Sequence, residues 1–249
     1  MKKIIPAILL VIATAPSAFA QSQGIPEQVM AKYYGAYDKK LNCWPAKAEQ
    51  GKYCMRIESL NMLYLDAVKR TYILATGELL DDSNQLVETH AAAGNVGAFI
   101  LEEKNGSAQV LSVAAQNQLG SNGTPLSGWR FQLLGSGNHW GWINASGYTA
   151  QGYTSGQYEI LMPIGRKISS VSKIAQMADN SGNCESKCTS ISSHFLVEDQ
   201  NPSEKYYPIK FIASGVKDGK KVSNKESVAR FNSASGEYEI SKDWPIKTY

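Results

Sequence analysis

The sequence has 249 residues and a formal net charge of +3, from 25 Lys and Arg against 22 Asp and Glu. This near-neutral charge argues against a protein that binds nucleic acid electrostatically, because such binding needs a concentrated basic face. A chain of this length can bury a full hydrophobic core without a metal ion or disulfides.

The first twenty residues have the pattern of a secretory signal. Lys2 and Lys3 precede an apolar run over residues 4–16, and Ala18-Phe19-Ala20 forms an A-x-A cleavage site. The run is too short to serve as a membrane span. We therefore expect residues 1–20 to be removed, the mature chain to lack a transmembrane segment, and the protein to be periplasmic or secreted.

Pro26 opens a stretch with helical spacing. Its apolar residues are Val29, Met30, Tyr33, Tyr34, Tyr37 and Leu41. Proline is well placed in the first turn of a helix, so we predict an amphipathic helix here. We divide the mature chain into residues 21–52, which hold this helix and a disulfide loop, and a β domain over residues 53–249.

Two hairpins are predicted next along the chain. Residues 55–78 fit either a helix or two strands around a turn near Asp66, and we favour the hairpin. Apolar runs at 97–103 and 107–114 flank Lys104-Asn105-Gly106, and Asn-Gly supplies the positive φ angles of a tight turn. A polar loop over 116–128 follows.

The remainder of the chain is rich in strand signals. Strands are expected at residues 129–134, 140–145, 158–162, 194–197, 206–213, 228–231 and 237–240. Ile168, Val171, Ala175 and Ala178 have the spacing of one further short helix, and the turn-rich residues 179–193 are a candidate subdomain boundary. The expected fold is therefore mainly β, an antiparallel sandwich or partly closed barrel with an N-terminal amphipathic helix.

The four cysteines allow three pairings. Proximity favours Cys43 with Cys54 and Cys184 with Cys188. Neither spacing is the C-x-x-C of a redox pair, and Cys43 and Cys54 stand further apart than most zinc-binding pairs. We predict two structural disulfides, in keeping with an oxidising compartment.

Residues 135–158 are unusual in composition, with six glycines and five aromatic residues interleaved with Asn138, Asn144, Gln151 and Gln157. Aromatic faces beside amide side chains suit a sugar-binding groove, because sugar C–H faces lie on rings while hydroxyls need donors and acceptors. The alternative is that these aromatics fill the core of a β domain and the glycines permit bends. The candidate ligand-binding residues are Asn138, His139, Trp140, Trp142, Tyr148 and Tyr153.

No catalytic signature stands out. The three histidines, His90, His139 and His194, form no metal-binding pair, and there is no G-x-S-x-G nucleophile motif. No catalytic residue, metal or cofactor is therefore predicted. Of the three, His139 is the most interesting, because it stands among glycines and tryptophans where a cleft can form.

The leading hypothesis is a non-catalytic binding protein that contacts an envelope glycan or another protein through residues 138–158. One alternative is an envelope hydrolase with a dispersed active site, using His139 and an acid such as Asp179. Another is a structural subunit of a surface assembly, with its helix or a strand edge inserted into a neighbour.

Overall fold

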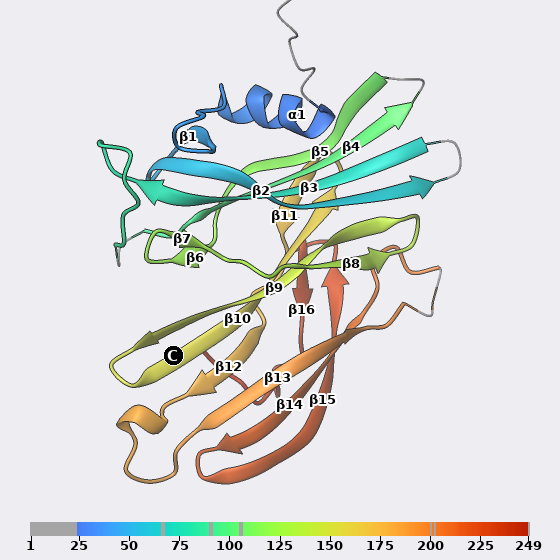
Figure 1. Ribbon diagram of the computed structural model, residues 1–249. Helices are drawn as coiled ribbons and strands as arrows, with labels where there is room; N and C mark the ends of the chain where they lie inside the picture. The colour runs from blue at the N-terminus through green and yellow to red at the C-terminus, as the bar shows by residue number, and fades with distance from the viewer. Residues whose placement is uncertain are drawn as a thin grey trace, which may run out of the picture.

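The structure is a computed structural model that describes residues 24–65, 68–89, 92–104, 107–199, 201 and 203–248 (Figure 1). The predicted signal at 1–20, the turn near Asp66, His90 and the Asn105-Gly106 turn lie outside these residues. Among the described residues, no helix has the length and apolar character needed to cross a membrane.

The predicted N-terminal helix is confirmed as α1 (Ile25–Tyr34), with Pro26 in its first turn. Val29, Met30 and Tyr34 are buried on one face, which is the amphipathic pattern. The helix ends at Gly35, whose φ of 92° a residue with a side chain rarely adopts. Tyr37 and Leu41 therefore lie beyond the helix.

Five strands pair antiparallel in chain order beneath α1. Both predicted hairpins are confirmed, since Leu65 lies opposite Val68 and Lys104 opposite Ser107. The five strands are β1 (Trp44–Ala48), β2 (Gly51–Leu65), β3 (Val68–Leu80), β4 (Asn95–Lys104) and β5 (Ser107–Gln118).

The polar loop after β5 contains a small separate hairpin, β6 (Gly120–Ser121) and β7 (Thr124–Pro125). A meander of three strands follows: β8 (Arg130–Gly135), β9 (His139–Ala150) and β10 (Tyr153–Ile164). The other strands are β11 (Lys167–Ser170), β12 (Ala175–Asp179), β13 (Ser190–Val197), β14 (Ile209–Lys217), β15 (Lys220–Asn232) and β16 (Glu237–Glu239).

Apart from β6 and β7, all the strands belong to one large sheet that folds over on itself. The path runs from β1 to β16 without closing. The ladders between strands are antiparallel except where Lys167 of β11 meets Val113 of β5, and an isolated parallel bridge joins Ser172 to Tyr238 of β16. In Figure 1, α1 covers one face of the β1–β5 part, and the β8–β10 meander lies against the other. The expected mainly β, sandwich-like fold with an N-terminal helix is confirmed, and within the described residues the sheet does not form a closed barrel.

Strand β10 is buried on both faces over residues 158–162. Leu161 packs with Trp142 and with Tyr72 of β3 in the core between the meander and the first five strands. Ile160 and Met162 point the other way, into the core shared with β12–β15 and the C-terminal segment. Burial on both faces explains why this stretch reads as a nearly continuous apolar run instead of alternating.

The prediction of a short helix at Ile168–Ala178 is wrong, because these residues form β11 and β12. Both strands pair along the same edge of β10. Ile168 packs into the core on one side of β10, whereas Val171, Ala175 and Ala178 pack into the core on the other side. These apolar residues therefore pack into two different cores, whereas the apolar stripe of a helix would face a single core.

Both predicted disulfides are present, Cys43–Cys54 and Cys184–Cys188, with Cα–Cα distances of 5.4 and 5.5 Å. The first is buried beside β1 and β2. The second follows the 3-10 turn η1 (Ser181–Asn183), inside the predicted boundary region 179–193. The division of the chain into residues 21–52 and 53–249 stays a prediction.

Candidate functional site

The structure separates the six candidate residues into three groups along β9 and the start of β10: Asn138 with His139, Trp140 with Trp142, and Tyr148 with Tyr153. Asn138 lies in the turn before β9 and His139 begins that strand, whereas Tyr148 and Tyr153 lie near its far end and at the start of β10. Tyr148 lies nine positions after His139 in an extended strand, which corresponds to about 30 Å. These side chains therefore do not form one site.

At the start of β9, the contacts of Asn138 and His139 are explained by the fold itself. Asn138 is exposed with a φ of 62°, which the β8–β9 turn requires and which asparagine tolerates. The His139 ring hydrogen-bonds the Ser136 carbonyl and packs edge-to-face with the Tyr206 ring, with the two ring centroids 5.5 Å apart.

Trp140 and Trp142 belong to an aromatic cluster. Trp140 is partly buried and stacks on Phe131 with ring centroids 4.9 Å apart. Trp142 is fully buried and packs at angles on Phe131 and Tyr72. Neither indole ring is positioned as an open platform for a ligand.

Tyr148 and Tyr153 are exposed, by 62% and 36% respectively. The β9–β10 pairing is regular, with Tyr148 opposite Ser155 and Ala150 opposite Tyr153. Directly opposed residues share a face and every second residue returns to it, so both tyrosines lie on the same face of the hairpin. That face also carries Trp142 and is therefore buried at one end and open at the other.

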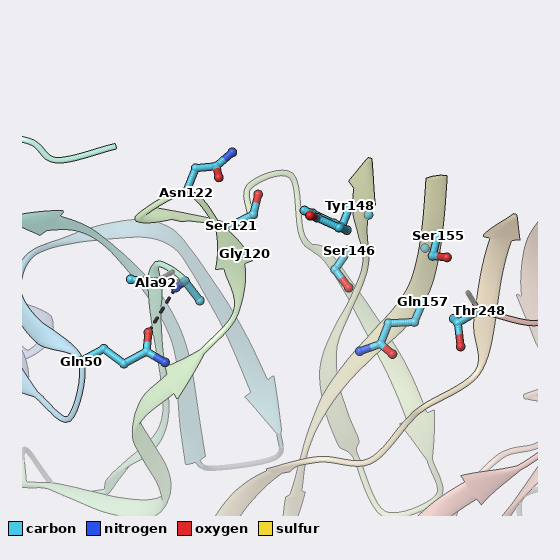
Figure 2. A pocket seen from close by; sticks show the side chains of 13 residues that line it. Gln50, Ala92, Gly120, Ser121, Asn122, Ser146, Tyr148, Ser155, Gln157 and Thr248 are labelled. Atoms are coloured by element: carbon cyan, nitrogen blue, oxygen red, sulfur yellow. Dashed lines mark hydrogen bonds between the residues drawn. The ribbon is translucent and has the colours of Figure 1, made fainter. Parts of the chain in front are cut away.

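A cleft of about 480 Å³ opens on this face beside Tyr148. Figure 2 shows one wall formed by β9, β10 and Thr248 near the C-terminus, and the other formed by the β1–β2 turn and the β6–β7 hairpin. Its polar side chains are neutral amides and hydroxyls: Gln50, Asn122, Gln157, Ser121, Ser146, Ser155 and Thr248. Among the described residues that line it, none carries a charge.

Hydrogen bonds hold the amides of the cleft in place. Gln50 accepts from the Ala93 backbone N–H at 3.1 Å (Figure 2). Gln157 donates its Nε2 to the Glu159 carboxylate at 2.6 Å. Gln50 and Gln157 thus each have one end of the amide fixed, which orients the other end and lowers the entropy lost when a ligand binds.

Glu159 is a buried carboxylate directly behind the cleft, with 4% of its surface exposed. Its Oε1 accepts from Ser146 and Gln157, and its Oε2 accepts from Ser170 at 3.2 Å. A buried carboxylate without such donors is strongly unfavourable. Glu159 therefore links the backs of Ser146 and Gln157 into one network.

Two glycines allow close packing of the chain within each wall. Gly120 has a φ of 121°, and a Cβ there would lie 2.1 Å from the Thr124 carbonyl oxygen. At Gly156, a Cβ would lie 2.7 Å from the Met177 side chain and 3.0 Å from the Ser146 carbonyl oxygen. A side chain at either position would distort the wall to which that glycine belongs.

The structure does not bring His139 and Asp179 together. Asp179 lies opposite Thr154 in the β10–β12 ladder, near the cleft, while His139 begins β9 at the other end of the meander. The Asp179 carboxylate accepts from the Ser181 hydroxyl and backbone and from the Ser190 hydroxyl, and these bonds hold its pKa below the usual value. The pair is not a catalytic dyad.

Several residues at the cleft were not singled out from the sequence, among them Gln50, Asn122 and Glu159. For Asn122 a signal existed, because Asn122-Gly123 is a hairpin-turn dipeptide with φ values of 54° and 76°. Gln50 comes from the β1–β2 turn, and no local pattern connects it with residues a hundred positions later. Comparison of the chain with known protein families, curated proteins and solved structures finds no match.

Proposed function

We propose that this protein is a non-catalytic binding protein of the cell envelope, and that the cleft beside Tyr148 holds an uncharged stretch of a glycan. The single observation that carries the proposal is the composition of the cleft: one exposed tyrosine ring among neutral amides and hydroxyls. The proposed ligand has both C–H faces for the ring and hydroxyls for the amides.

The absence of charge among the described lining residues supports a neutral ligand. Phosphate and carboxylate ligands are usually bound by Arg, Lys or helix N-termini. A polyhydroxylated ligand instead exchanges hydrogen bonds with groups that both donate and accept, which is what Asn122, Gln157 and Ser121 offer. A cleft of this size suits a short oligosaccharide segment.

A location outside the cytoplasm supports an envelope ligand. The pattern of residues 1–20 predicts export, and the two disulfides are typical of proteins that mature in an oxidising compartment. Envelope glycans are abundant in such a compartment. We infer that the mature chain works in the periplasm or after secretion.

The test is binding of the mature chain to an array of neutral oligosaccharides and to purified peptidoglycan glycan strands. We expect Tyr148→Ala to weaken binding roughly tenfold or more, because it removes the exposed ring. Tyr148→Phe should retain most of the affinity. Tyr64→Ala is the matched control, since Tyr64 is 77% exposed on β2 and does not line the cleft.

Two results would overturn the proposal. One is that no neutral glycan binds the mature protein at millimolar concentration. The other is that Tyr148→Ala and Tyr64→Ala bind glycan equally well, which would place the contact elsewhere on the surface.

A further inference from the structure

A second groove lies on the opposite side of the first five strands, between α1 and the outer edge of β5. It measures about 620 Å³. Ile25, Val29 and Tyr33 of α1 form one wall, and Val110 and Leu111 of β5 contribute to the floor. This groove shares no lining residue with the cleft beside Tyr148.

The outer edge of β5 is open along this groove. One side of β5 pairs with β4, from Ser107 opposite Lys104 to Gln118 opposite Asn95. On the other side, the only strand partner among the described residues is Lys167, opposite Val113. An edge of this kind accepts one more strand through its backbone groups.

A bulge limits the length of edge that such a strand can use. The β4–β5 register shifts between Ile100 and Leu101, which leaves Leu111 without a partner in β4. The regular edge therefore covers residues 107–110, about 13 Å of extended chain. This length matches a short peptide segment better than a full additional strand.

The charges at the groove have one sign. Lys32 lines it from α1 and Arg166 from the turn before β11, and both are exposed. No carboxylate is present among the described lining residues, and neither cation forms an ion pair within the described part of the chain. A bound segment with acidic side chains would place opposite charges beside both of them.

We propose that this groove binds an extended, acidic peptide segment of a partner protein, which adds to the edge of β5 as a short strand. Backbone hydrogen bonds to residues 107–110 would supply the pairing. Apolar side chains of the segment would contact Val29, Tyr33 and Val110, and its carboxylates would lie near Lys32 and Arg166.

The probe is an acetylated and amidated eight-residue peptide of alternating Val and Glu, labelled for fluorescence anisotropy at low ionic strength. We expect saturable binding that weakens with added salt, because exposed charge pairs are screened. The same peptide with Lys in place of Glu tests the charge. A version with N-methyl groups on alternate residues tests the backbone pairing, and both versions should bind much more weakly.

The double variant Lys32→Gln/Arg166→Gln should weaken binding of the acidic peptide roughly five- to tenfold. The matched control is Lys47→Gln/Lys220→Gln, which removes two exposed lysines outside the groove and should bind like the unaltered protein. All four positions are exposed, so we expect both double variants to fold like the unaltered protein.

The proposal is overturned if the acidic peptide does not bind at millimolar concentration or if the N-methylated peptide binds equally well. It is also overturned if the two double variants weaken binding of the acidic peptide to the same extent. Binding of anionic phosphatidylglycerol vesicles without binding of the peptide would also overturn it. Glycan binding through Tyr148 is measured separately, so either proposal can fail alone.

Discussion

The two ends of the β9–β10 hairpin use similar residues for opposite purposes. At one end Trp142 and Leu161 face each other across the ladder, fully buried against β3 and β4. At the other end Tyr148 and Ser155 face each other on the same side of the ladder, beside an open cleft. Aromatic composition alone does not distinguish core from binding surface. Whether an aromatic residue is buried depends on whether another part of the sheet packs against its face of the hairpin.

The largest expected effect is a difference in the free energy of unfolding between substitutions at the two ends of the hairpin. Trp142→Ala should lower the free energy of unfolding by about 3–5 kcal/mol, because it leaves a large cavity in a packed core. Tyr148→Ala should change it by less than about 0.5 kcal/mol, since its ring is exposed. Urea unfolding of the two variants measures both values, and equal losses would contradict the division.

A smaller effect is expected at Glu159, between the two ends. Glu159→Ala should lower the free energy of unfolding by about 1–3 kcal/mol, because Ser146, Gln157 and Ser170 lose a buried acceptor. It should also weaken the binding of any ligand that contacts Gln157, because Gln157 loses the hydrogen bond that orients its amide.

Glu159→Gln is the control for this position, because it keeps one carbonyl acceptor and a similar volume. We expect it to be more stable than Glu159→Ala in urea unfolding. If both variants match the unaltered protein in stability and in ligand affinity, the network does not position the cleft.

The smallest effect concerns Asp179, whose pKa is lowered mainly by hydrogen bonds from Ser181 and then from Ser190. A carboxyl with a lowered pKa in the folded state stabilises the protein above the ordinary Asp pKa of about 3.9, and this contribution disappears as the pH falls through the lowered value. Asp179→Asn should therefore be slightly less stable at neutral pH, and the difference should vanish in acid. Thermal unfolding at several pH values measures it, and a constant difference would contradict the assignment.

Local patterns predicted the hairpins and disulfides well. The β4–β5 hairpin follows from two apolar runs around Asn105-Gly106, and the cysteine pairs follow from short separations. These features depend on residues that are close in the chain, where turn chemistry and loop length are decisive.

Features that depend on distant segments could not be predicted in the same way. Ile168 and Val171 have helical spacing, but they pack into cores on opposite sides of β10. Likewise, Gln50 reaches the cleft only because the first five strands fold over the meander. The grouping of Asn138 and His139 with Tyr148 and Tyr153 treated neighbours along the chain as neighbours in space, which an extended strand contradicts.

The burial of β10 on both faces couples the folding of the two halves of the chain. Because its alternate side chains complete two cores, removing the segments on either side of β10 exposes one of its apolar faces. We therefore expect calorimetry to record a single melting transition, and fragments severed on either side of the meander to aggregate when expressed alone.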